Sequence, residues 1–497
     1  MKISRYIGIA STVFLLTACG DYLDKIPSKS SNTPVEEASQ LLALYDYTSN
    51  RYTTNYFDLY GTDDTEIPTG LYAARPGNFN LNYVVSNYCH YRDGIIAASS
   101  DGLWENCYSH IYTANLIISS ASSVTGDEAT VKEGLANAYY MRAFNYFKLL
   151  TYYCLPWSAA NRDALGLPLR MGLSFDESVK RSTLEETYNQ IFADLASAEE
   201  NVTGDGVPSN CWRVSRCAIN ALYARIYLQR GEYQEALDYA NAALNNAPEL
   251  FDWNKFQWGR QVVYAATSTW PAVTLDYCET NSWDMTEILH DYSEWIYPDL
   301  SYYPTQMAYP SQQLLNIYDQ KNDLRYVFNV VEHGARRMSI DYEWPRYDEL
   351  DDGRYAKDGL TTAEMLLIKA ECQVRLGQWQ QGLATLTPLR EARFRTGTSS
   401  ALTADDQAEA LQKVLQERRR EMPFTARMGD IKRFSVTDTP DDDVTITRQF
   451  FDVTLTGVDT STPKTWTIPG NSPELAMPIY QTEINSSHGV IEQNPAE

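Results

Sequence analysis

The chain has 497 residues, enough for two or three ordinary domains or for one long repeat array. Its formal net charge is −24 at pH 7, and loss of the two basic residues near its start would bring this to −24 − 2 = −26. Such an acidic surface repels phosphate backbones and anionic lipid headgroups. It therefore argues against nucleic acid as a partner, and against membrane adhesion through basic side chains.

The first residues have the order of a secretory signal: a basic start, an apolar run over 7–16 and then small residues. Leu-Thr-Ala-Cys, ending at Cys19, resembles a bacterial lipobox, in which the cysteine is acylated and becomes the new N-terminus. We predict a signal peptide over 1–18, lipidation at Cys19 and a polar tether over 19–34. The sequence after the signal has no second run of about 18 apolar residues, so the lipid is expected to be the attachment to the membrane.

Helical spacing of apolar residues predicts a series of helices in the first half of the chain. Thr183 and Glu186 form a capping-box signal, which predicts where one of these helices begins. The stretch 48–101 is rich in Tyr, Asn, Gly and Asp, and we expect it to be irregular with short helical pieces. The longer helices are predicted over residues 35–47, 104–119, 136–153 and 183–200.

Two stretches follow the tetratricopeptide pattern of paired helices. In residues 221–248, Gly231 stands at the turn and Pro248 follows the second helix. Residues 363–393 repeat the arrangement, with a turn at 376–379 and one return helix. Because an isolated helix pair cannot bury its apolar face alone, several must stack. The predicted fold is mainly α, with tetratricopeptide-like helix pairs forming a superhelical scaffold that carries long irregular loops.

Residues 251–310 differ in composition from the repeats around them. They hold five Trp, seven Tyr and two Phe, or 14/60 = 23% aromatic residues, against 12% for the whole chain. Several prolines break any long helix there, so we predict a small aromatic-rich insertion with minor β structure. Residues 444–467 alternate like a β-hairpin. We predict one domain over 35–497, made of a helical part (35–250), the insertion with its loops (251–350), and C-terminal helix pairs with a tail (351–497).

Charged residues on apolar helix faces are expected to pair with one another, as for Arg142 and Glu371. The cluster Glu417–Glu421, with Arg427, Asp430 and Arg433, could form an anion site. Opposite charges at short spacing favour instead an ion-pair network that ties the last helices together.

Seven cysteines remain besides Cys19, and an odd number cannot all form disulfides. They are scattered and include no Cys-x-x-Cys motif, so most are predicted to be small buried apolar residues. They are Cys89, Cys107, Cys154, Cys211, Cys217, Cys278 and Cys372.

Catalytic motifs are absent from the sequence. None of the five histidines forms a close metal-ligand pair, and there is no Gly-x-Ser-x-Gly elbow or phosphate-binding glycine loop. The acidic runs at 348–352 and 441–443 lack the spacing of a calcium loop and are expected to be solvated turns. We predict no enzyme activity, no cofactor and no metal site.

An ordered set of motifs resembles the SusD/RagB family of outer-membrane lipoproteins of Bacteroidetes. In two places the sequence departs from that pattern: Thr425-Ala426 replaces the usual acidic residue and glycine, and Met477-Pro-Ile-Tyr480 replaces a Pro-Ile-Pro. The matching motifs lie at Trp104–Asn115, Ala138–Phe147, Arg181–Leu195, Arg213–Leu228, Glu364–Glu371, Glu417–Glu421 and Arg427–Arg433.

This resemblance implies a protein that captures a nutrient, usually an oligosaccharide, at the cell surface. It implies a partner, a SusC-like TonB-dependent transporter, over which the lipoprotein closes like a lid to deliver its cargo. It also implies an outer-membrane location, with the lipid anchor holding the protein on the exterior face. The alternative is a peptide- or protein-binding repeat lipoprotein with its ligand along the helical groove.

Sugar recognition needs flat rings for the C–H faces of the sugar and a few polar groups for its hydroxyls. Two regions offer both kinds of side chain, the irregular N-terminal stretch and the aromatic insertion. The resemblance implies ligand contacts from loops at comparable places, although each tryptophan of the insertion could equally belong to a small core. The predicted ligand-binding residues are Asp64, Tyr72, Arg75, Tyr91, Trp270, Trp283, Trp295 and Tyr297.

Overall fold

The computed structural model describes residues 35–47, 52–100, 102–266, 271–279, 293–302, 308–335, 340, 342–349, 354–398, 401–439 and 442–496. The predicted signal peptide, the tether and Cys19 lie outside the described residues and stay predictions. Within the described part of the chain, no helix is both long and apolar enough to cross a membrane. The predicted mainly α fold is confirmed.

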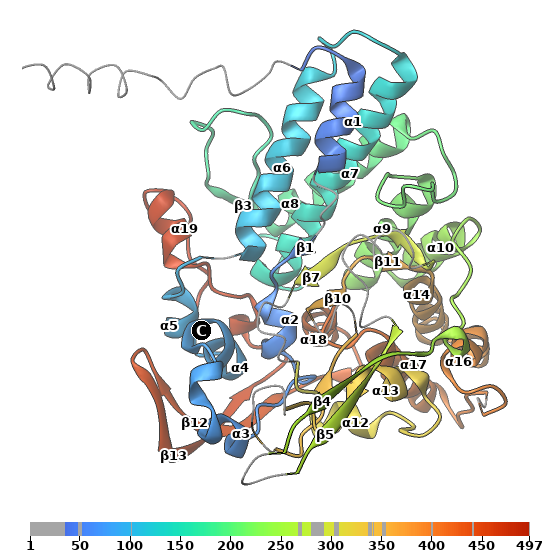
Figure 1. Ribbon diagram of the computed structural model, residues 1–497. Helices are drawn as coiled ribbons and strands as arrows, with labels where there is room; N and C mark the ends of the chain where they lie inside the picture. The colour runs from blue at the N-terminus through green and yellow to red at the C-terminus, as the bar shows by residue number, and fades with distance from the viewer. Residues whose placement is uncertain are drawn as a thin grey trace, which may run out of the picture.

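Long helices make up the upper part of the molecule in Figure 1, where α1, α6 and α7 run side by side. The predicted capping box starts α8: Thr183 Oγ1 accepts from the Glu186 N–H at 3.1 Å, and the Glu186 carboxylate accepts from the Thr183 N–H at 2.8 Å. The helix predicted from residue 136 begins earlier, at Glu128, because Asp127 caps it. These helices are α1 (Ala38–Tyr47), α6 (Gly102–Ser120), α7 (Glu128–Tyr153) and α8 (Leu184–Asn201).

Short helices fill the stretch between α1 and α6, as its turn-rich composition predicts. Asn55 caps the first of them by accepting from the Phe57 N–H at 3.1 Å. They are α2 (Tyr56–Gly61), α3 (Thr69–Ala74), the 3-10 turn η1 (Pro76–Asn78), the π turn η2 (Leu81–Val85), α4 (Ser86–Cys89) and α5 (Arg92–Ile96).

Both tetratricopeptide-like pairs are present, each with a glycine at its turn. Gly231 has φ +72° and Gly377 has φ +84°, a left-handed conformation that glycine adopts at little cost. The second pair differs from the prediction in one respect: its return helix is broken at Leu386, because Pro388 lies in the first turn of a new helix. The elements are α9 (Arg216–Gln229) with α10 (Tyr233–Leu244), and α14 (Thr362–Arg375) with α15 (Trp379–Thr385) and α16 (Thr387–Arg393).

The sheets are small. The predicted C-terminal hairpin is confirmed as β12 (Ile446–Thr454) and β13 (Gly457–Ile468), with Thr454 opposite Gly457 at the turn. One three-stranded sheet has the order β1 (Tyr52–Thr53), β7 (Leu300–Tyr302), β10 (Tyr355–Lys357). The other antiparallel pairs are β2 (Leu165–Pro168) with β3 (Arg181–Thr183), β4 (Trp258–Tyr264) with β5 (Val273–Cys278), β6 (Trp295–Tyr297) with β11 (Leu360–Thr361), and β8 (Val330–Val331) with β9 (Arg346–Tyr347).

Further short elements join these parts: η3 (Trp253–Lys255), α12 (Gln312–Asn316), α13 (Leu324–Asn329), η8 (Pro473–Leu475) and α19 (Gln481–Ser486). Two longer helices, α17 (Gln407–Glu421) and α18 (Arg427–Phe434), precede the C-terminal hairpin.

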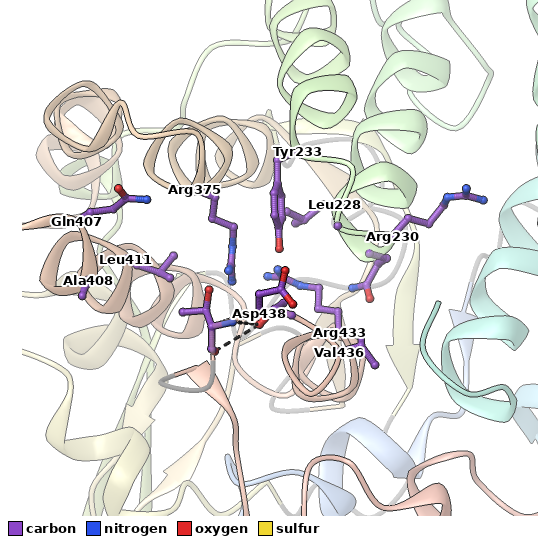
Figure 2. A pocket seen from close by; sticks show the side chains of 14 residues that line it. Leu228, Arg230, Tyr233, Arg375, Gln407, Ala408, Leu411, Arg433, Val436 and Asp438 are labelled. Atoms are coloured by element: carbon purple, nitrogen blue, oxygen red, sulfur yellow. Dashed lines mark hydrogen bonds between the residues drawn. The ribbon is translucent and has the colours of Figure 1, made fainter. Parts of the chain in front are cut away.

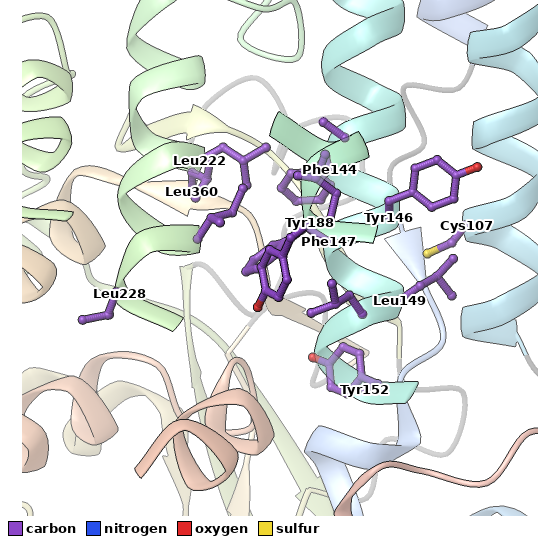
Figure 3. Packing of buried hydrophobic residues seen from close by; sticks show 14 of the residues in the cluster. Cys107, Phe144, Tyr146, Phe147, Leu149, Tyr152, Tyr188, Leu222, Leu228 and Leu360 are labelled. Atoms are coloured by element: carbon purple, nitrogen blue, oxygen red, sulfur yellow. The ribbon is translucent and has the colours of Figure 1, made fainter. Parts of the chain in front are cut away.

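The largest hydrophobic core lies where α7, α8 and α9 meet. Figure 3 shows Phe147, Tyr188 and Leu222 converging there from those three helices. All seven cysteines after Cys19 are buried and outside any disulfide, which confirms their predicted role as small core residues. Burial raises the pKa of the Cys89, Cys217 and Cys372 thiols, which keeps them protonated.

A buried seam of charged and aromatic residues joins β6 to α17. Arg393 contacts Glu294 and Glu421, both at 2.8 Å, and Arg325 contacts Glu417 at 2.7 Å and Glu421 at 2.9 Å. Burial alone would raise the pKa of Glu417, but the charges of the neighbouring arginines outweigh it and hold the pKa below its usual value. The β6–α17 seam consists of Glu294, Trp295, Tyr297, Arg325, Arg393, Glu417 and Glu421.

The predicted ion-pair network is therefore confirmed, and it extends beyond the last helices. Arg433 contacts Glu371 at 2.6 Å and Asp430 at 2.8 Å, while Arg142 contacts Asp194 at 2.6 Å. Because each cation is already held by a carboxylate, the cluster serves as scaffold and leaves little charge for an added anion.

The departure at Thr425-Ala426 coincides with an unusual backbone. Ala426 has φ +57° and stands at the N-cap of α18. A side chain in this left-handed conformation costs about 1 kcal/mol relative to glycine. This explains why the resembled family usually carries a glycine there.

Candidate functional site

Two of the eight predicted ligand-binding residues, Trp270 and Trp283, lie outside the described residues. Two others, Trp295 and Tyr297, are each only 1% exposed and belong to the β6–α17 seam. The Tyr297 hydroxyl lies 3.2 Å from that of Tyr45, and its ring packs 4.7 Å from the ring of Tyr140. Both rings pack in the core, and ligand contact by these two residues stays a prediction.

Asp64 and Tyr72 are also inside the fold. Asp64 accepts from Arg419 Nε at 2.6 Å and from the Phe424 N–H at 3.1 Å. The Tyr72 ring packs 5.0 Å from that of Phe450. Both side chains are buried, and their contact with a ligand stays a prediction.

Arg75 and Tyr91 remain accessible. Arg75 is exposed at the end of α3. Tyr91 is half-buried with its ring 6.3 Å from that of Trp466, beside a hollow of about 260 Å³. The structure thus does not gather the six described residues of this set into one site.

A larger hollow of about 480 Å³ opens at the turn of the first tetratricopeptide-like pair, where Tyr233, Arg375 and Arg433 reach inward (Figure 2). Its arginines are committed to the scaffold: Arg375 contacts Glu371 at 2.8 Å and Asp442 at 2.7 Å. The hollow has one aromatic ring, and its arginines are already paired with carboxylates. Few groups in it therefore remain to bind a ligand.

A still larger hollow, of about 740 Å³, is an aromatic groove between α6, the loop that links β2 to β3, and α19 with the residues after it. The loop and α19 both lie toward the left edge of Figure 1. This volume is within the range of ordinary ligand pockets. The lining residues are Trp104, Glu105, Tyr108, Ser109, Tyr112, Asn115, Pro168, Arg170, Gly172, Phe175, Asp176, Glu177, Val179, Glu483, Ser486, Ser487, His488 and Ile491.

Helix α6 supplies one wall through Trp104, Tyr108 and Tyr112, which recur every four residues on one helix face. The row runs from core to solvent: Trp104 is 4% exposed and Tyr112 is 38% exposed. The Tyr108 hydroxyl donates to the Pro168 carbonyl at 2.9 Å, which ties α6 to the opposite wall. Tyr108 therefore fixes the inner end of this wall. The ring of Tyr112, at its outer end, faces the groove.

Hydrogen bonds from the scaffold hold the base of the loop that forms the second wall. The Asn115 amide donates to the carbonyls of Arg170 at 2.9 Å and Gly172 at 3.1 Å. The Tyr146 hydroxyl accepts from the Arg170 N–H at 2.6 Å. Beyond this base Phe175 is 86% exposed, and its ring is stacked on Tyr112 with centroids 6.1 Å apart and planes 18° apart.

The polar groups of the groove include four carboxylates, on Glu105, Asp176, Glu177 and Glu483. Burial, and next the charge of Glu105, raise the pKa of Glu483. A planar pair of rings beside carboxylates can pack against the C–H face of a sugar while accepting hydrogen bonds from its hydroxyls. Within the described residues, no group of three or more His, Cys, Asp or Glu side chains is arranged to hold a metal ion.

Sequence reasoning missed this groove, although two signals pointed to it. Tyr112 continues the helical row that already contains Trp104 and Tyr108. Phe175 is a lone large aromatic residue in a polar loop, where an apolar ring has no core to join.

The fold is a helical-repeat scaffold that carries an aromatic groove. The family described as "Starch-binding associating with outer membrane" matches residues 21–228, and the family described as "SusD family" matches residues 360–496. The chain belongs to the SusD/RagB family, as its motifs predicted.

Two curated relatives come from Formosa agariphila. SusD-like protein P2 is 24% identical over 393 residues, which cover 69% of this chain and 72% of the relative. SusD-like protein P38 is 24% identical over 369 residues, covering 64% of this chain and 69% of the relative.

Solved structures share the fold. A SusD superfamily protein from Bacteroides thetaiotaomicron has a TM-score of 0.64 at 19% identity, covering 93% of this chain and 100% of that one. A putative sugar binding protein from Bacteroides vulgatus has a TM-score of 0.65 at 18% identity, covering 93% and 99%. A laminarin binding SusD-like protein has a TM-score of 0.56 at 16% identity, covering 93% and 100%.

Proposed function

We propose that this protein is a cell-surface lipoprotein that captures an oligosaccharide in the aromatic groove and delivers it to a SusC-like TonB-dependent transporter without transforming it. The observation that carries the proposal is the exposed stacked pair Tyr112 and Phe175 above a row of carboxylates. The Phe175 ring is 86% exposed, and exposed apolar surface rimmed by polar residues is typical of ligand-binding grooves. Family membership and the laminarin-binding structural relative support glycan as the cargo.

Glycan arrays, followed by calorimetry on the positive sugars, test the capture step. The chain from residue 20 onward should bind at least one oligosaccharide, and Tyr112→Ala with Phe175→Ala should weaken binding at least about tenfold, the equivalent of ~1.4 kcal/mol. Tyr47→Ala is the matched control, because Tyr47 is 88% exposed and is not a lining residue of the groove. Binding that survives the double substitution would place the cargo elsewhere.

Anchoring and delivery need native cells. Incorporation of labelled palmitate should depend on Cys19 and disappear in Cys19→Ser. Affinity capture of the native protein should recover a large β-barrel transporter, and recovery of soluble partners alone would contradict the delivery step.

The acidic aromatic groove also suits a basic peptide, because lysine and arginine pair with carboxylates and stack on rings. A peptide array run beside the glycan array separates this second candidate. Peptide binding without glycan binding would favour it.

A further inference from the structure

We infer that the aromatic groove selects uncharged oligosaccharides and rejects glycans that carry carboxylate or sulfate groups. This inference rests on the proposed function and names the class of cargo. It follows from which polar groups of the wall remain available to a ligand.

Four hydrogen-bond donors of the groove are committed to the protein's own backbone, while Ser109, Tyr112 and His488 also line it. Tyr108 and Asn115 donate to carbonyls of the β2–β3 loop, as described above. The hydroxyls of Ser486 and Ser487 donate to the carbonyls of Thr482 at 2.8 Å and Ile484 at 2.7 Å. These groups hold the groove in shape and are not free to hold an anionic substituent.

The single arginine of the groove is committed in the same way. Arg170 Nη2 donates to the Ser174 carbonyl at 2.7 Å, and its Nε lies 3.4 Å from the Glu177 carboxylate. Recognition of carboxylate or sulfate usually requires such a fork of N–H donors to be open. Here the loop that carries Arg170 occupies two of the three nitrogens of its fork, Nε and Nη2.

Acceptors, by contrast, remain. Among the described residues, Glu105, Asp176 and Glu483 have no ion-pair partner, and a carboxylate oxygen accepts up to two hydrogen bonds. A neutral sugar offers several hydroxyl donors to such a wall, whereas an anionic sugar brings like charge to it. The formal net charge of −24 adds a long-range repulsion of the same sign.

Matched probes test the inference. A panel of neutral glucan, mannan and xylan hexasaccharides is titrated at pH 8, where histidine side chains are neutral. The tightest binder is then compared with its own sulfated form. We expect the sulfated form to bind at least about tenfold more weakly. This gap in affinity should narrow when the salt concentration rises and screens the repulsion.

Neutralised variants assign the discrimination to the groove. Asp176→Asn with Glu483→Gln keeps acceptor oxygens but removes two charges. It should narrow the difference in affinity between the neutral and the sulfated form by about tenfold. The affinity for the neutral sugar should change less. Glu235→Gln with Asp238→Asn on α10 removes the same charge from another exposed helix face and should leave the gap unchanged.

The outcomes distinguish a failure of the charge selection from a failure of glycan capture itself. Equal or tighter binding of the sulfated form, or a gap unaffected by Asp176→Asn with Glu483→Gln, would overturn the charge selection and leave glycan capture standing. If no glycan binds at all and a lysine-rich peptide does, the proposed function fails and the inference fails with it.

Discussion

The β6–α17 seam and the aromatic groove are built from the same residue types, yet they differ in what those residues can do. In the seam, Trp295 and Tyr297 are buried and Glu417 and Glu421 are held by arginines. In the groove, Phe175 and Tyr112 reach solvent, and Glu483 has no cation beside it among the described residues. A ligand surface therefore differs from a core in whether its side chains can reach a ligand, and not in which residue types it contains.

The largest expected effect comes from removing a cation of the seam. Arg393→Met leaves Glu294 and Glu421 buried and removes the ion pair that each of them makes with Arg393. We expect the free energy of unfolding to fall by about 5 kcal/mol, the upper end of what a broken buried ion pair costs. Urea denaturation measures this loss. Lys132→Met breaks the exposed pair with Glu128 and should cost less than about 1 kcal/mol.

A somewhat smaller loss of stability is expected when an aromatic side chain of the seam is removed. Trp295→Ala removes a fully buried ring and should lower the free energy of unfolding by about 3–4 kcal/mol. Glycan affinity, measured per folded molecule, should not change. Loss of affinity without loss of stability would show that Trp295 faces ligand, and would erase the contrast between the two regions. Trp258→Ala, at a ring that is 51% exposed, is the control.

The smallest expected effects concern how stability changes with pH. They should have opposite signs for Glu421 in the seam and Glu483 in the groove. The pKa of Glu421 is lowered in the fold, where burial would raise it but the charges of Arg393 and Arg325 prevail. Its contribution to stability is therefore full above its unfolded pKa of about 4.3 and is lost as the pH falls through the lower folded pKa. Glu483 has a raised pKa, so its contribution is full below that unfolded value and is lost as the pH rises through the folded pKa.

Urea midpoints between pH 3 and pH 8 check both signs. Wild-type protein should lose stability below about pH 4 because the seam is protonated. Glu483→Gln should be slightly more stable than wild type at neutral pH, by less than about 1 kcal/mol because the site is half-exposed and screened. A Glu483→Gln variant that is less stable at neutral pH would mean that the carboxylate is held by a cation, contrary to the groove described here.

Local sequence by itself determined the helices, their caps and the repeat turns. Thr183 with Glu186, Gly231 and the alternation before Gly457 each specify a structure within a few neighbouring residues, so their effect can be read without the fold. The pair between Glu417 and Arg420 on α17 was also predictable, because opposite charges three residues apart lie on one helix face. The distant partners of this helix, Arg325 and Arg393, were decided by the fold.

Tertiary structure alone decided which aromatic rings are exposed. Trp295 and Phe175 look equally suited to a sugar in the sequence, but strand pairing with β11 buries one, while a loop fastened at Arg170 holds the other in solvent. Burial depends on which distant segments pack together, and one sequence read locally carries little of that information. The scaffold was therefore predictable from the sequence, and the groove required the fold.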